Sequence, residues 1–411
     1  MQQQELIPHL FRTEYTKIVA VLCKHFGFDQ IETAEDIASD TFLTAAQTWS
    51  LSSIPPNPVA WLYMVAKNKA KNYLQRRNFF EHKISPELEK NSSITDDGEI
   101  DLSLQNIRDS QLQMMFAICH PLISPEAQIS LSLRILCGFG IEEIADAFLT
   151  NKETINKRLQ RAKEKLRQEK VSIEIPALAE INDRLETVLR TIYLLFSEGY
   201  YSSSHDTTIR KDLCLEAMRL CTMLVENKDT NKPSANALLA LMCFHASRFE
   251  ARLDKNGELI LYNEQDTNLW NAELISKGAH YLHNASTGDK LSKYHLEASI
   301  AYWHTQKADT PEKWESILQL YNKLLRLEYS PVAALNRTFA LSKANGKEAA
   351  IIEAKKLQLN NNHFYYLLLG ELYTDIDNDK AKTNLTKAII LAKSQPDRHS
   401  IQKKLEKLNE Q

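Results

Sequence analysis

Apolar residues spaced three or four positions apart constrain this chain more than any other feature, because such spacing gives a helix one buried face. Ile37, Thr41 and Ala45 repeat this spacing between Ala34 and Trp49. Only 10 of the 411 residues are Gly, and Leu, Ala, Lys, Glu and Ile dominate, which favours helices over sheets. We therefore expect an all-α protein, and a chain of this length divides into several domains.

The net charge of -3 conceals two basic segments. Residues 67–83 hold six Lys or Arg against one Glu, and residues 151–170 hold eight against three Glu. Local basic patches bind phosphates even in a weakly acidic protein. The alternative is a pair of solvated helix faces, and the charge pattern alone does not choose between the two.

Six cysteines show neither a CxxC pair nor the ligand spacing of a zinc site, so we expect buried free thiols, no metal and no cofactor. Cys119 and His120 are adjacent, but without further ligands a structural role is favoured. The first six residues lack the features of a signal peptide, and no apolar stretch is long enough to span a bilayer. The expected location is the cytoplasm.

Composition divides the chain into four zones. Residues 1–84 and 106–170 have helical patterns, and the polar, acidic residues 85–105 between them are expected to form a linker. Residues 171–411 are expected to form a C-terminal helical domain.

The first helical zone places aromatic and cationic side chains on one helix. A loop of turn-forming residues, 50–58, precedes a helix over Val59–Arg77 that carries Trp61 and a row of Lys and Arg. Rings stack on unpaired bases while cations neutralise phosphate, so this pattern suits single-stranded nucleic acid. Trp61 taken alone is more often a core residue.

The second helical zone has the pattern of a helix–turn–helix. Ser124 can cap a helix with Pro125 in its first turn, a Gly-containing break follows, and a short helix leads to a basic helix over Lys152–Gln168. Ile155, Leu159, Ala162 and Leu166 are expected to face inward. The start of such a helix reaches base edges in the major groove.

The segments AEDIASDTF, NPVAWLYMVAKNKAKNYLQRR and IEEIADAFLTNKETINKRLQRAKEKLR resemble regions two and four of sigma-70 family RNA polymerase sigma factors of the extracytoplasmic-function type. The resemblance implies a region 2 module at 1–84 and a region 4 helix–turn–helix at 106–170. It implies polymerase docking by Asp36, Asp40 and Phe42. It implies contact with the −10 element by Asn57, Trp61, Lys67, Asn68, Lys71, Arg76 and Arg77. It implies contact with the −35 element by Lys152, Thr154, Asn156, Lys157, Arg158 and Arg161. The Pro-rich loop before Trp61 departs from the family pattern. The resemblance therefore does not indicate which −10 base would be captured.

Later segments, including YLLFSEGY and SPVAALNRTFAL, are similar to the branch of these factors with a large C-terminal extension. Leu335-Asn336-Phe339 and Leu369-Gly370-Tyr373 recur at a period of 34, the tetratricopeptide length. Stacked helical hairpins of this kind leave a concave surface suited to a peptide or protein partner. A non-repetitive helical bundle is the alternative.

His245, Arg248 and Arg252 share one helical face if a single helix runs through all three. We favour a buried polar network that specifies the fold. The other interpretation is a pocket for an anionic ligand.

The resemblance implies a sigma factor that binds the β′ clamp and β flap of core RNA polymerase and directs promoter recognition, DNA melting and initiation. The main alternative is a ligand-sensing helix–turn–helix regulator that acts without polymerase, which leaves the first module unexplained. A tetratricopeptide scaffold that has lost DNA function is a further alternative. No nucleophile–base pair or Gly-rich phosphate loop indicates an enzyme, and no catalytic residue is assigned.

Overall fold

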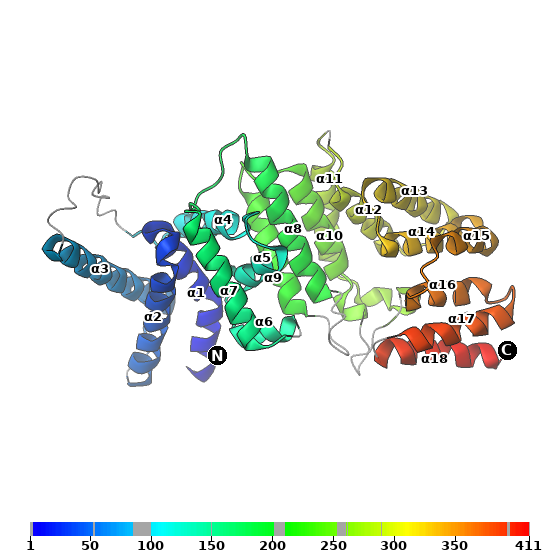
Figure 1. Ribbon diagram of the computed structural model, residues 1–411, viewed down its shortest axis with the longest axis horizontal. Coiled ribbons are helices and arrows are strands. Elements are labelled where there is room, and N and C mark those ends of the chain that lie inside the picture. Colours follow the sequence, from blue (N-terminus) through cyan, green and yellow to red (C-terminus); the bar gives the residue numbers. More distant parts are fainter. Residues whose placement is uncertain are drawn as a thin grey trace. The chain divides into compact units, whose positions relative to one another are not determined.

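The computed structural model describes residues 3–51, 54–84, 100–148, 150–200, 210–252, 260, 262–288, 290–392 and 395–410 (Figure 1). Every regular element within these ranges is helical, which confirms the all-α prediction for this part of the chain. Most of the predicted linker, residues 85–99, lies outside the described residues. The chain divides into two compact units, Met1–Leu194 and Leu195–Gln411.

The first unit begins with three helices. They are α1 (Gln3–Phe26), α2 (Ile31–Leu51) and α3 (Pro58–Ile84), and a short 3-10 turn, η1 (Phe28–Gln30), lies between α1 and α2. Tyr15, Ile18 and Leu22 of α1 and Leu62 of α3 are fully buried between them, in keeping with the predicted three- and four-residue spacing.

The segment predicted to form a helix–turn–helix is helical, with a turn between its helices, in the second half of this unit. α4 (Leu104–Ile118) leads to α5 (Pro125–Leu131), which a π-helical turn η2 (Ser132–Leu136) extends. Gly138 then adopts a φ of +73°, a conformation that favours Gly, and the chain turns into α6 (Ile141–Ala147). α7 (Lys152–Gln168) has the predicted bounds, and its four predicted inward residues are all buried.

The two halves of the first unit pack on each other. α1 packs against both α4 and η2. Near this contact Lys163 of α7 and Arg134 of η2 both pair with Glu35 of α2. The two predicted DNA-reading modules therefore form one compact unit in this structure.

Helix α8 (Ile181–Tyr200) carries the division between the two units. Leu185, Val188 and Leu189 in its first half are buried. Arg184 donates a hydrogen bond of 2.6 Å to the carbonyl of Phe116, and the Thr191 hydroxyl donates one of 2.9 Å to Oε1 of Gln128. The first compact unit therefore extends past residue 170, where we predicted the end of the helix–turn–helix domain.

The second unit contains ten further α-helices in the described residues. In chain order they are α9 (Lys211–Glu226), α10 (Pro233–Ala246), α11 (Ala272–Ala285), α12 (Lys293–Thr305), α13 (Pro311–Leu327), α14 (Pro331–Asn345), α15 (Lys347–Leu357), α16 (His363–Tyr373), α17 (Asn378–Leu391) and α18 (Gln395–Asn409). Figure 1 shows α16, α17 and α18 lying side by side, and consecutive helices from α12 to α18 pack on one another.

The predicted 34-residue repeat falls at the first helices of two hairpins. Leu335 and Leu369 occupy α14 and α16, and both are buried in one apolar cluster. A Cβ on Gly370 would lie 2.7 Å from Leu385 of α17, so this Gly allows α16 and α17 to pack closely. Whether the hairpins form tetratricopeptide repeats remains a prediction.

One expectation about the second unit is wrong. We expected a single helix through His245, Arg248 and Arg252, but α10 ends at Ala246 and the chain continues into a 3-10 turn at Phe249–Ala251. Arg252 instead lies over the ring of Tyr200, 4.0 Å from its centroid, and Arg248 lies 5.4 Å from that of Tyr262. Both arginines therefore pack on aromatic rings.

Candidate nucleic-acid and polymerase interface

The outer face of α7 carries the residues predicted to read DNA. Asn151 caps the helix by accepting a hydrogen bond of 2.8 Å from the backbone N–H of Thr154. The predicted residues Lys152, Thr154, Asn156, Lys157 and Arg161 are exposed, whereas Arg158 is partly buried. A strongly basic, solvent-facing row at the start of a helix suits contact with phosphates and base edges.

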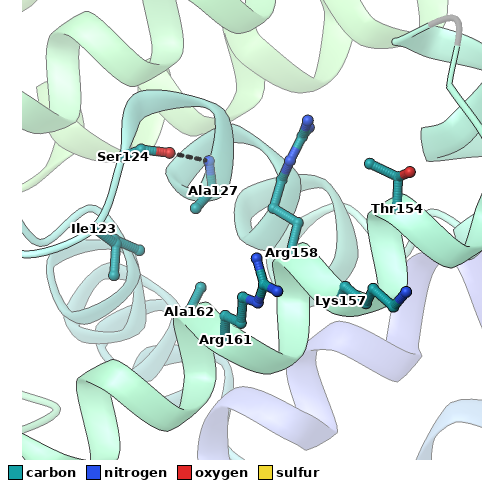
Figure 2. Close-up of a pocket in the computed structure, with 8 residues that line it drawn as sticks. All are labelled: Ile123, Ser124, Ala127, Thr154, Lys157, Arg158, Arg161 and Ala162. Atoms are coloured by element: carbon teal, nitrogen blue, oxygen red, sulfur yellow. Dashed lines mark hydrogen bonds between the residues drawn. The ribbon is translucent and has the colours of Figure 1, made fainter.

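A depression of about 410 Å³ lies between α7 and the start of α5. Thr154, Lys157, Arg158 and Arg161 line its α7 side, and Ile123, Ser124 and Ala127 line the opposite side. Figure 2 shows the Arg158 and Arg161 side chains projecting from α7 beside this space, with the Ser124 hydroxyl accepting a hydrogen bond from Ala127. The depression is therefore open and cationic on one side.

Neighbouring groups hold some of these side chains in place. Nη1 of Arg158 donates a hydrogen bond of 3.3 Å to the Ser130 hydroxyl, and its guanidinium lies 5.5 Å from the centre of the Phe148 ring. Lys157 forms an ion pair of 2.6 Å with Glu153, and Lys152 pairs with Glu142. Arg158 is therefore partly preorganised, while the exposed lysine pairs are weak enough to exchange for phosphate.

Helix α3 carries the second predicted DNA-reading surface. Asn68, Lys71, Arg76 and Arg77 are exposed along it, and Lys67 is partly buried. Between them, Lys69 pairs with Asp40 of α2. α3 therefore presents a basic surface that follows the helix.

Two of the predicted α3 residues have structural contacts. The side-chain oxygen of Asn57 accepts a hydrogen bond of 3.0 Å from the backbone N–H of Ala60, so Asn57 caps α3. The ring of Trp61 lies 5.3 Å from that of the buried Trp49 and is only partly exposed. Both side chains help to fix the start of α3.

Helix α2 presents an exposed stripe at three- and four-residue spacing. Asp36, Asp40 and Leu43 lie on this stripe, and Leu43 is 55% exposed. The predicted docking residue Phe42 is not on it. Phe42 is 4% exposed and its ring lies 5.1 Å from that of Phe11, so Phe42 is a core residue and its assignment as a direct contact is corrected.

Local sequence patterns do not indicate which residues join the two modules. Glu35 pairs with Lys163 and Arg134, which lie far along the chain, and no local pattern marks such a partnership. Leu43 was also not predicted as a docking residue. An apolar residue on the same helix face as the polar Gln47, four residues later, can be recognised in the sequence.

The six cysteines are free and buried, as predicted, and burial raises the pKa of Cys119 to about 11. In the described part of the chain, no three His, Cys, Asp or Glu side chains gather as metal ligands would. Within the same ranges, no helix has the length and hydropathy needed to cross a membrane.

Comparisons with known proteins agree with this description. Residues 10–80 match the family model for sigma-70 region 2. This matched segment contains most of α1, α2 and α3. Residues 184–286 match a family of unknown function (DUF6596). The region 2 match supports a sigma-70 family sigma factor.

A bacterial relative extends the similarity over most of the chain. The uncharacterized protein R00370 of Rhizobium meliloti (strain 1021) is 32% identical over 374 residues, which cover 89% of this chain and 87% of the relative. The chain belongs to the same family as this protein. The crystal structure of the yeast Tom70 aligns with 99% of this chain and 88% of its own at 12% identity, with a TM-score of 0.31, too low to indicate a shared fold.

Proposed function

We propose that this protein is a sigma factor of the extracytoplasmic-function type that binds core RNA polymerase and directs transcription initiation. The observation that carries the proposal is the combination, in one compact unit, of a matched region 2 with a helix–turn–helix whose last helix is basic and exposed. A regulator that acts without polymerase has no use for the region 2 module, which counts against that alternative.

Polymerase docking is assigned to the exposed stripe of α2. Asp36 and Asp40 supply negative charge and Leu43 an apolar contact on one accessible helix face. Such a mixture of charge and apolar area suits a protein interface, with charge setting orientation and apolar contact adding affinity. Phe42 supports the stripe from the core side of the helix.

Promoter recognition is assigned to α7 and α3. The cations of α7 neutralise phosphates, and an Arg can read a guanine edge with two hydrogen bonds. The basic surface of α3 suits the backbone of the separated −10 strand, beside the partly exposed ring of Trp61. Asn57 contributes by fixing the start of α3.

The second unit is proposed to be a tetratricopeptide-like interaction domain that regulates or completes initiation. Its helical hairpins and the 34-residue recurrence in α14 and α16 support this assignment. In this proposal no step requires a catalytic residue or a cofactor.

Binding to core polymerase tests the docking assignment. An Asp36→Lys/Asp40→Lys variant should bind core RNA polymerase at least tenfold more weakly than the wild type in a competition assay. A Glu153→Lys/Glu164→Lys variant changes the same charge on α7 and serves as the control. Equal binding by the wild type and the α2 variant would contradict the assignment.

A further inference from the structure

A groove of about 680 Å³ opens within the second unit. Its lining comes from the segment around Tyr262–Trp270, from the turn before α13 that carries Lys307, and from helices α13 to α18. Because several elements distant in sequence build it, the groove is a product of the hairpin packing. It is separate from the α7 depression of the first unit.

The floor of the groove is aromatic. Trp314 packs edge-to-face on Phe339 with ring centres 5.6 Å apart, and Tyr262 lies 6.2 Å from Trp270. Trp314 is 4% exposed and Trp270 8% exposed. Neighbouring groups cover most of both rings. The two Trp rings therefore form an apolar floor but leave no free ring face on which a base could stack.

The walls of the groove are cationic. Six lysines and two carboxylates line it, an excess of four positive charges. The lysines are Lys307, Lys313, Lys343, Lys347, Lys404 and Lys407. The carboxylates are Asp309 and Glu371, and both have partners.

The partners of the two carboxylates lie within the groove itself. Asp309 accepts a hydrogen bond from Nε1 of Trp314 and lies 4.0 Å from Lys343, and Glu371 pairs with Lys404. Lys307 and Lys407 are exposed, and no ion pair to either is found within the described ranges. The positive charge of these two lysines is available to a ligand.

Two buried polar atoms of the lining indicate the kind of ligand. Nε1 of Trp270, a donor, and Oε1 of Gln265, an acceptor, have no hydrogen-bond partner in the part of the chain that the structure describes. A peptide group offers both an acceptor and a donor, whereas a phosphodiester backbone offers acceptors alone. The pair therefore favours a polypeptide over a nucleic acid backbone.

We propose that this groove binds a short acidic peptide segment of a partner protein. Carboxylates of the segment pair with Lys307 and Lys407, and an apolar side chain rests on the floor formed by Trp314 and Phe339. The inference goes beyond the proposed function in initiation, because it assigns the second unit a ligand of defined chemistry. It does not depend on polymerase binding.

Selection from random peptides tests the proposal without assuming a sequence. The full-length protein is used to select octapeptides from a phage-displayed library, and the affinities of the selected peptides are measured by fluorescence anisotropy. We expect Asp and Glu to be enriched around a large apolar residue. We also expect binding to weaken with rising salt, as charge pairing requires.

Matched variants locate the binding. Lys307→Gln/Lys407→Gln should weaken binding of the selected peptides about tenfold, because two charge contacts are lost. Lys228→Gln/Lys323→Gln removes two exposed lysines outside the groove, and Arg158→Ala/Arg161→Ala removes charge from α7. Both controls should bind as the wild type does, and all four changed lysines are exposed, so folding is preserved.

Three results would overturn the proposal. They are selected peptides without an excess of acidic residues, equal affinity of the groove variant and the wild type, and displacement of the peptide from the Arg158→Ala/Arg161→Ala variant by a single-stranded oligonucleotide. The last result would assign the groove to nucleic acid. None of these assays contains polymerase, so failure here is distinct from failure of the proposed role in initiation.

Discussion

Nζ of Lys163 on α7 lies 2.5 Å from Oε2 of Glu35 on α2, and both side chains are only 13% exposed. Arg134 approaches the other carboxylate oxygen of Glu35 at 3.5 Å. One acidic side chain of the region 2 module is therefore shared by two cations of the helix–turn–helix. This contact joins α2 to α7 and η2 within the first unit.

Removing Glu35 should destabilise the first unit strongly. Glu35→Ala leaves two partly buried cations without their carboxylate, a loss of about 3 kcal/mol in the free energy of unfolding. Urea unfolding followed by circular dichroism measures it. The control is Glu32→Ala, which removes the carboxylate that pairs with Arg167. Glu32 is more exposed than Glu35, so its loss should cost less than about 1 kcal/mol.

A paired substitution separates charge burial from packing. Glu35→Met together with Lys163→Met removes the carboxylate and one of its two cations at similar volume. It should recover part of the stability lost in Glu35→Ala, because Arg134 still lacks its carboxylate. If the double variant is no more stable than Glu35→Ala, the ion pair does not account for the loss.

Truncation within the chain should reveal the role of α8. A protein that ends at Lys170 lacks the buried residues Leu185, Val188 and Leu189 and the hydroxyl that bonds Gln128. Losing three buried aliphatic side chains removes roughly 5 kcal/mol, comparable with the stability of a whole domain. We expect residues 1–170 to be poorly soluble and inactive in transcription, and residues 1–200 to be folded.

Thermal unfolding and promoter-directed transcription of both truncated proteins measure this difference. If residues 1–170 unfold at the same temperature as residues 1–200, α8 does not support the helix–turn–helix. The predicted domain boundary at residue 170 would then describe the folding unit better than the boundary at Leu194.

Helices could be predicted where the local sequence pattern determines their bounds and their buried face. The bounds of α7 and the inward positions of Ile155 and Leu159 follow from period and capping, because each depends on residues within a few turns. The burial of Phe42 is harder to predict, because the adjacent residues Thr41 and Phe42 of α2 are both buried. The sequence alone does not say how wide the buried face is.

Long-range contacts could not be predicted from the sequence. The pairing of Glu35 with Lys163 joins residues 128 positions apart, and the sequence pattern around either residue does not indicate its partner. The end of α10 at Ala246 was missed because Ser247 and Arg248 do not interrupt a helical pattern as Gly or Pro would. The groove of the second unit combines side chains from several hairpins, so the stacking of helices had to be known first.

Replacing arginines of α7 should separate phosphate contact from base reading. Arg161→Ala should weaken promoter binding and lower the slope of log affinity against log salt by about one if Arg161 meets a phosphate. If it reads a guanine edge, specificity at one −35 position should relax instead, at a cost of about 1–3 kcal/mol. Lys165→Ala, which changes a lysine that bonds Glu169 outside the depression, is the control.

Gel-shift titrations at several salt concentrations distinguish these outcomes. An Arg161→Ala protein that keeps wild-type affinity, salt dependence and specificity would show that this face of α7 does not meet DNA. Arg158→Ala is a less direct probe, because Arg158 also bonds Ser130 and packs on Phe148.

Acid should destabilise the second unit through His304. Burial, with the nearby charges of Arg248 and Lys313, lowers the pKa of His304 to about 3, whereas an unfolded His has a pKa of about 6.5. Below pH 6.5 the unfolded chain binds a proton that the folded chain excludes, so stability is present above that pH and is lost as pH falls towards 3. The expected loss at pH 5 is about 2 kcal/mol.

Thermal unfolding of the full-length protein between pH 7 and pH 5 measures this effect. His304→Gln should reduce the pH dependence of the midpoint, and His280→Gln, which changes an exposed His, should leave it unchanged. Identical pH dependence in the wild type and His304→Gln would exclude His304 as the source. Burial also lowers the pKa of His245, which acts in the same direction.

Mapping transcription starts tests the central claim most directly. The purified protein is combined with core RNA polymerase and fragmented genomic DNA of its source, and the 5′ ends of the transcripts are sequenced. The account predicts starts that require the protein and share a pair of motifs upstream, near −10 and −35, and an Arg158→Ala/Arg161→Ala variant should lose these starts. Starts that are the same with and without the protein would contradict the assignment as a sigma factor.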